Sequence, residues 1–160
     1  MKLSELKNNL KKLPKIKEHD YYIYLGQAIK LIGEQEEVYN CVVFVEQKAY
    51  LKHWESLPTA RVLTLDKIAR VEYPPYCLPE KIAQAILDKI EPIEDRYIYY
   101  LRLKNGECIQ CQTDFMVSFV RLPEGYSVHD IDSVENLAKP LPTTRAKFHI
   151  KGLEYGWCFY

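Results

Sequence analysis

An Asn-Gly pair between two strand-like runs constrains the fold of this 160-residue chain more than any other feature. Residues 96–113 read RYIYYLRLKNGECIQCQT, and residues typical of strands lie on both sides of Asn105 and Gly106. A two-residue type I′ turn needs positive φ at both central residues, and Asn and Gly adopt that conformation at the lowest cost. The sequence therefore predicts a β-hairpin with its turn at these two residues.

The hairpin decides how the C-x-x-C spacing of Cys108 and Cys111 is interpreted. A two-residue turn pairs Leu103 with Cys108 and Tyr100 with Cys111, so the two thiols lie on opposite faces of the sheet. Three residues along a strand span about 10 Å, whereas a disulfide needs Cα atoms within about 7 Å and zinc holds thiolates at about 2.3 Å. We therefore predict that this motif neither binds metal nor forms a disulfide.

The remaining cysteines offer no second C-x-x-C pair: Cys41, Cys77 and Cys158. An odd number of scattered cysteines is typical of reduced thiols in a cytoplasm. The first residues contain no apolar segment of a secretory signal, and no apolar run approaches the length of about 20 residues that spans a bilayer. We expect a cytoplasmic protein.

The other segments predict an α+β fold, mainly an antiparallel β-sheet in the order strands, helix, strands, with about three short helices. Leucines three or four residues apart indicate a helix that ends at Pro14, and PEKIAQAILDKIE at 79–91 is the clearest helix. Further strands are predicted at 21–32, 38–46, 61–66, 115–122 and 152–160. No linker is evident, so we expect one domain over residues 1–160.

Two further motifs depart from the site patterns that they resemble. GYSVH at 125–129 lacks the second glycine of a nucleophile elbow, and Ser127 is instead expected to cap a short helix with Asp130 three residues on. DIDSVE at 130–135 has Val134 and Glu135 where a calcium loop needs a ligand and a glycine. None of the histidines has ligand spacing: His19, His53, His129 and His149. We expect no catalytic, cofactor-binding or metal-binding residues, and hence not an enzyme.

Charge is balanced overall but unevenly distributed. The chain has 22 basic and 22 acidic residues, so net charge indicates neither a nucleic-acid nor a membrane partner. Residues 1–17 are rich in lysine, residues 122–138 carry only acidic charges, and residues 139–151 carry only basic ones. The 13 tyrosines either pack in the sheet or anchor a protein interface. These features leave a binding protein as the expected class.

Across all 160 residues the chain resembles the immunity proteins of bacterial contact-dependent growth inhibition systems, as a small, tyrosine-rich α+β protein with no net charge and patches of both signs. The resemblance implies a cytoplasmic protein that binds the toxin domain of a neighbouring cell, often a nuclease, and blocks its active site. The acidic stretches with Glu34, Glu36 and Glu37, or from Glu124 to Glu135, would suit a toxin whose cleft is basic. The resemblance assigns no partner-binding residue.

The alternative function is binding of single-stranded nucleic acid. The order strands, helix, strands also resembles the Whirly fold, although only Lys151-Gly152-Leu153 matches a fragment of that family's lysine-glycine motif. Tyrosines can stack on bases, and a set of lysines near the N-terminus could contact phosphates: Lys2, Lys7, Lys11, Lys12, Lys15 and Lys17. Such binding would weaken steeply with salt.

Overall fold

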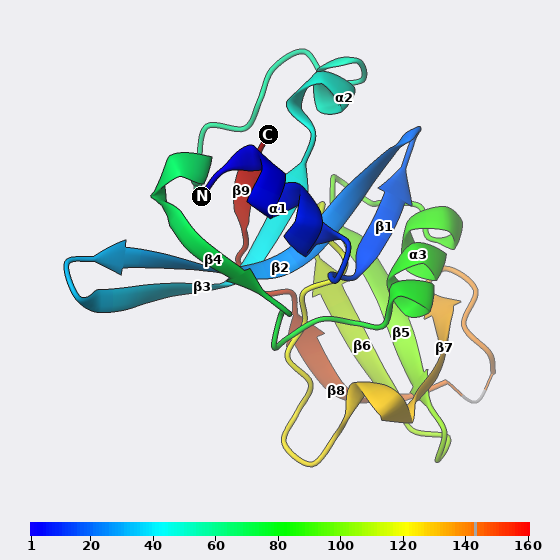
Figure 1. Cartoon of the computed structure of the whole chain (residues 1–160). Helices are drawn as coiled ribbons and strands as arrows, with labels where there is room; N and C mark the ends of the chain where they lie inside the picture. The colour runs from blue at the N-terminus through cyan, green and yellow to red at the C-terminus, as the bar shows by residue number, and fades with distance from the viewer. Residues whose placement is uncertain (143) are drawn as a thin grey trace. The chain divides into compact units, whose positions relative to one another are not determined.

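The computed structural model describes residues 1–142 and 144–160 (Figure 1). It confirms an α+β fold dominated by β-structure. The described helices are α1 (Leu3–Leu10), α2 (Gln47–Leu51) and α3 (Glu80–Lys89), with short 3-10 helices at Leu65–Lys67 and Val128–Asp130. The strands are β1 (Lys15–Glu18), β2 (Tyr21–Ile32), β3 (Gln35–Val45), β4 (Ile68–Glu72), β5 (Tyr97–Leu103), β6 (Cys108–Thr113), β7 (Ile131–Asn136), β8 (Ala146–Lys151) and β9 (Gly156–Phe159).

The chain forms two compact units, each with its own sheet. The first unit comprises Met1–Tyr76 with Glu154–Tyr160, and the second comprises Cys77–Leu153. The expectation that residues 1–160 act as a single domain stays a prediction.

The sheet of the first unit has the order β1-β2-β3-β9, and β4 pairs with β2. The predicted antiparallel pairing of the second and third strands is confirmed, with Ile23 opposite Val45 and Ile32 opposite Gln35. The predicted aromatic last strand is confirmed as β9, which runs parallel to β3. β2 is the longest of the described strands, and it ends just before Gly33, where φ is +65°.

The core of the first unit lies between α1 and one face of this sheet. Leu6 and Leu10 of α1 and Leu13 after it are buried, as their spacing predicts, and they pack in one cluster with Phe44. The ring of Phe44 lies over Gly26, where a Cβ atom would come within 2.9 Å of Phe44 Cε2. Gly26 is therefore required by the close approach of this ring to the neighbouring strand.

The sheet of the second unit has the order β7-β5-β6-β8. Alternate residues of β5 are buried, namely Tyr97, Tyr99, Leu101 and Leu103, which form one face of the strand. The predicted helix at 79–91 is confirmed as α3, whose buried Ile82, Ala83 and Ile86 share one face. Figure 1 shows α3 beside β7 in this unit.

The β5–β6 hairpin is confirmed, but its predicted register is wrong by one residue. Arg102 rather than Leu103 lies opposite Cys108, and Tyr99 rather than Tyr100 lies opposite Cys111. The loop has three residues: Leu103 N donates to Glu107 O at 2.8 Å, and Gly106 has a φ of +88°. Because only the glycine of the Asn-Gly pair takes positive φ, the loop is a turn followed by a bulge rather than a type I′ turn.

Two predicted strands are wrong. Residues 61–66 form only an isolated bridge at Val62, and the strand begins at Ile68 after a 3-10 helix. Residues 115–122 are an irregular segment that is buried from Met116 to Val120. Its backbone pairs with other segments instead of a strand, since Ser118 O and Phe119 O accept bonds at 2.8 and 2.9 Å from Leu78 N and Leu153 N. A run buried on every side has no alternation by which to recognise it.

The predicted cap at Ser127 is confirmed, although the helix that follows is shorter than expected. Ser127 Oγ accepts from His129 N at 3.2 Å, and Ser127 N donates to Asp130 Oδ2 at 3.0 Å. Only Val128–Asp130 is helical, and β7 begins at Ile131.

Candidate functional site

The ends of β2 and β3 form a projecting hairpin in the first unit. We call residues 30–38 the arm. β4 accompanies β2 only as far as the pair of Lys30 with Ile68, so the rest of the arm is a two-stranded ribbon. Figure 1 shows this ribbon extending away from the other elements of its unit. An extended ribbon of this kind can enter a cleft in another protein.

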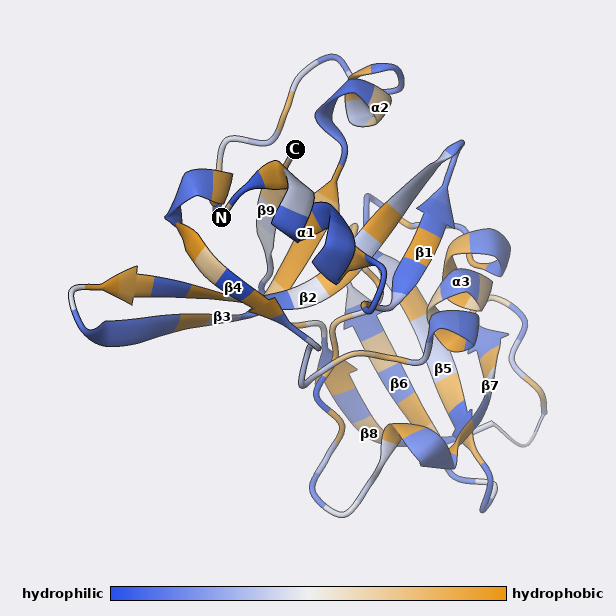
Figure 2. Ribbon diagram, viewed as in Figure 1, coloured by the Kyte–Doolittle hydropathy of each residue, from blue (hydrophilic) through white to orange (hydrophobic). Residues whose placement is uncertain are grey.

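The arm exposes apolar side chains together with acidic ones. Leu31, Ile32 and Val38 are 54%, 60% and 47% exposed, and Figure 2 shows the hydrophobic end of β2 at the tip. The same segment carries three glutamates, Glu34, Glu36 and Glu37. The first acidic stretch identified in the sequence is thus placed beside an exposed apolar surface, which is a combination found at protein interfaces.

Arg70 of β4 fixes the base of the arm. Its guanidinium binds both carboxylate oxygens of Glu36, with Nη2 at 3.0 Å from Oε2, and its Nε contacts Glu72 at 2.8 Å. The hydrogen bond from Arg70 holds the pKa of Glu36 below its usual value. A two-pronged arginine–carboxylate contact restricts orientation more than a single contact does, so Arg70 restrains Glu36 relative to β4.

The outer edge of β3 along the arm is open. In the part of the chain that the structure describes, β9 pairs with β3 only from Val42 to Val45, so residues 35–41 have no strand on that side. An unpaired edge presents backbone donors and acceptors to which an extended segment of another protein can add.

The second acidic stretch, Glu124 to Glu135, is used largely within the fold. Glu135 accepts from Arg102 Nε and from Thr144 Oγ1, the latter at 2.8 Å. These contacts lower the pKa of Glu135, with the Arg102 hydrogen bond as the main cause. Asp130 is part of the helix cap described above. Among the described residues, this stretch also has no large exposed apolar side chain beside its acids, so it is a weaker candidate for a partner surface than the arm.

The lysines near the N-terminus gather partly around one exposed tyrosine. Lys15 Nζ lies 4.4 Å from the ring centroid of Tyr22, and Lys17 Nζ lies 5.8 Å from it. Tyr22 is 43% exposed. This pairing of basic and aromatic groups is the geometry that the nucleic-acid alternative requires.

Two histidines that are far apart in the sequence form a stacked pair. His19 follows β1 with a φ of +53°, and its ring stacks on that of His53 with centroids 4.4 Å apart. His53 Nε2 is 2.6 Å from Asp20 Oδ1. Trp54 Nε1 donates to the hydroxyl of Tyr21 at 3.0 Å beside them. Sequence spacing could not reveal this pair, because a turn and a helix more than 30 residues apart bring the rings together.

Glu18 lies next to this cluster, where burial disfavours its charged form. Burial raises the pKa of Glu18 to about 7, and nearby His53 opposes the shift. Its Oε2 atom is buried and makes no hydrogen bond within the described residues. The folded state favours the protonated carboxyl of Glu18. Its contribution to the free energy of unfolding is therefore complete below the unfolded pKa of 4.5 and is lost as the pH rises through about 7.

We therefore expect Glu18→Gln to gain stability relative to the wild type as pH rises. Between about pH 5 and about pH 8 the gap in unfolding free energy should widen by about 1–2 kcal/mol, a value reduced from the full shift because the group is partly exposed. Urea titrations at several pH values measure it. Glu55→Gln, at an exposed position, is the matched control. A constant gap between wild type and Glu18→Gln across this range would contradict the prediction.

Cys108 and Cys111 are buried, which disfavours their thiolate forms at neutral pH. Burial raises the pKa of Cys111 to about 12 and that of Cys108 above its usual value. Cys108 faces the side of Arg102, and Cys111 faces the side of Tyr99, so the two thiols are on opposite faces. No cluster of three or more potential metal ligands occurs among residues 1–142 and 144–160.

Comparison with protein-family models, curated proteins and solved structures finds no match to this chain. In the described parts of the sequence, no helix combines the length and apolar character needed to cross a membrane.

Proposed function

We propose that this chain is a cytoplasmic immunity protein that binds one cognate toxin domain and covers its active site, with the arm as the main contact. The observation that supports it best is the arm itself, which exposes Leu31 and Ile32 beside Glu34 at the end of a supported ribbon. Apolar side chains stabilise the bound state when they are removed from water, and glutamates attract a basic cleft such as that of a nuclease.

The size of a stable complex indicates that more than the arm takes part. Specific interfaces bury about 1,600 Å² in total, of which a nine-residue ribbon can supply only part. The open edge of β3 would add backbone hydrogen bonds to an extended toxin segment. Self-pairing of two arms is disfavoured, since it would bring Glu36 and Glu37 of both copies close together.

Co-expression with the toxin domain encoded by the neighbouring open reading frame tests this function. We expect the two proteins to co-purify in a fixed ratio and the cells to grow, whereas the toxin alone arrests growth. Purification of each protein separately, together with no rescue of growth, would show that the proposal is wrong.

Single-stranded nucleic-acid binding is the second candidate, and the observation that favours it is the position of Lys15 and Lys17 over the exposed Tyr22 ring. Fluorescence anisotropy with a labelled single-stranded oligonucleotide tests it. Tight binding that falls steeply with salt and is lost in Tyr22→Ala would place this function first.

A further inference from the structure

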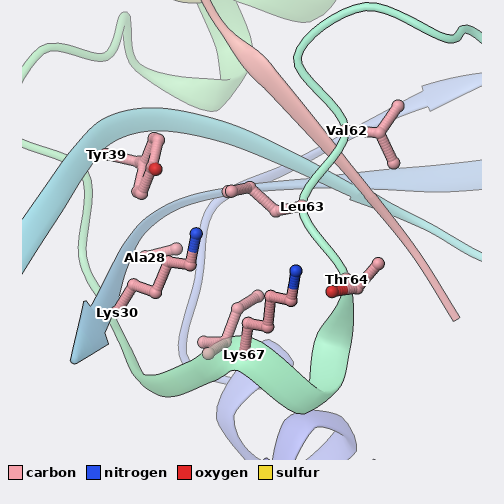
Figure 3. Close-up of a pocket in the computed structure, with 8 residues that line it drawn as sticks. Ala28, Lys30, Tyr39, Val62, Leu63, Thr64 and Lys67 are labelled. Atoms are coloured by element: carbon pink, nitrogen blue, oxygen red, sulfur yellow. The ribbon is translucent and has the colours of Figure 1, made fainter. Parts of the chain in front are cut away.

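A small pocket of the first unit brings two lysines together. Its volume is about 90 Å³. The apolar wall includes Ala28, Leu63 and Ile68, and the polar groups include Lys30, Thr64 and Lys67. Figure 3 shows the ammonium groups of both lysines pointing toward the same space, with the Thr64 hydroxyl on the side of Lys67.

The fold itself forces this convergence. Lys30 of β2 lies opposite Ile68 of β4, and Lys67 is the last residue of the 3-10 helix that leads into β4. Thr64 precedes that helix, but its side chain makes no capping hydrogen bond. Among the residues that the structure describes, neither ammonium group forms an ion pair or a side-chain hydrogen bond. Two like charges that line one pocket repel each other, and a bound anion would relieve that repulsion.

We propose that this pocket binds a phosphate group, held between the ammonium groups of Lys30 and Lys67 with the Thr64 hydroxyl as a further donor. A dianion is favoured over a monoanion because it satisfies both cations at once. An open groove of about 440 Å³ shares Lys30, Lys67 and Ile68 with the pocket, so it can hold the organic part of a phosphate monoester. The phosphate proposal does not rest on the toxin-binding function, although the pocket shares Lys30 with the base of the arm.

Two carboxylates limit the affinity. Glu37 lies opposite Lys30 in the β-ladder. It also forms a hydrogen bond with Tyr39 in the pocket wall, and this bond is the main reason why the pKa of Tyr39 is raised. Asp66 lines the adjoining groove. Because Glu37 competes with the ligand for Lys30, its removal should strengthen binding rather than weaken it.

Isothermal titration calorimetry with inorganic phosphate and with ribose 5-phosphate tests the site. We expect one site, with Lys30→Gln and Lys67→Gln each weakening binding roughly tenfold. Lys48→Gln, on the exposed surface of α2, should leave affinity unchanged. Glu37→Gln should tighten binding several-fold, which keeps the test decisive even if a lysine variant is misfolded.

The two ligands distinguish the sources of the phosphate group. Tighter binding of ribose 5-phosphate identifies a monoester ligand, and equal or tighter binding of inorganic phosphate identifies the free ion. The second ionisation of a phosphate monoester has a pKa of about 6, so ribose 5-phosphate should bind more weakly at about pH 5 than at about pH 7, whereas sulfate should not. Binding of neither phosphate ligand, or equal affinity in Lys30→Gln, Lys67→Gln and the wild type, would overturn the proposal.

Discussion

Phe44→Ala should lower the unfolding free energy of the first unit by about 3–5 kcal/mol. Phe44 is fully buried between α1 and the sheet, so its removal leaves a cavity in the middle of the cluster that contains Leu6 and Leu10. Urea unfolding followed by tryptophan fluorescence measures the loss selectively, because both tryptophans, Trp54 and Trp157, belong to this unit. Ile32→Ala, at a 60% exposed position, should change stability by less than about 0.5 kcal/mol.

Gly26 supplies a second test of the same packing. In the wild type, Gly26→Ala should destabilise by about 1–3 kcal/mol, since the new Cβ atom would lie 2.9 Å from Phe44 Cε2 and 3.0 Å from Leu13 Cδ1. In the Phe44→Ala background the first of these clashes is gone. We therefore expect the double substitution to lower the free energy of unfolding by less than the sum of the two single substitutions. Strict additivity would contradict the close contact between the ring and the neighbouring strand.

Regular hydrophobic periods predicted the helices and most strands well. They could not predict the irregular segments of the chain. The leucines of α1 and the face formed by Ile82, Ala83 and Ile86 of α3 were recognisable because each buries one side only. Residues 116–120 are buried on every side in an irregular segment, so the same criterion predicted a strand at 115–122 wrongly. The hairpin register failed for a narrower reason, because Asn-Gly is compatible with both a two-residue and a three-residue loop.

The candidate sites were harder to predict from the sequence than the fold was, because they depend on tertiary structure. The glutamates of the arm were identified from the charge pattern. Their projection together with Leu31 and Ile32 was not predicted, because it depends on where β4 stops pairing with β2. The convergence of Lys30 with Lys67 and the stacking of His19 on His53 join segments that no local pattern connects. The placement of Cys108 and Cys111 on opposite faces did not depend on the register, since residues three apart on a strand face opposite sides in either register.

Replacing Leu31 and Ile32 together by threonine should weaken toxin binding by roughly a hundredfold or more, if the arm is the main contact. Burying an apolar side chain of this size contributes about 1.5 kcal/mol or more, and a factor of ten corresponds to about 1.4 kcal/mol, so the loss of two such side chains accounts for a hundredfold. Threonine is β-branched and therefore suits a strand at both positions, so the arm should keep its conformation. Both side chains are more than half exposed, at 54% and 60%, and the stability of the unit should therefore change little.

Surface plasmon resonance with the toxin domain measures the loss, and growth rescue measures its consequence. Leu141→Thr, at a 53% exposed position of the second unit, is the matched control and should bind as the wild type does. Glu34→Gln should act differently, by slowing association and reducing its dependence on salt, because a charge at the tip steers the encounter more than it holds the complex. If the toxin binds the threonine variant at wild-type affinity, the contact lies elsewhere on the protein, and the immunity function itself is still tested by the co-expression experiment.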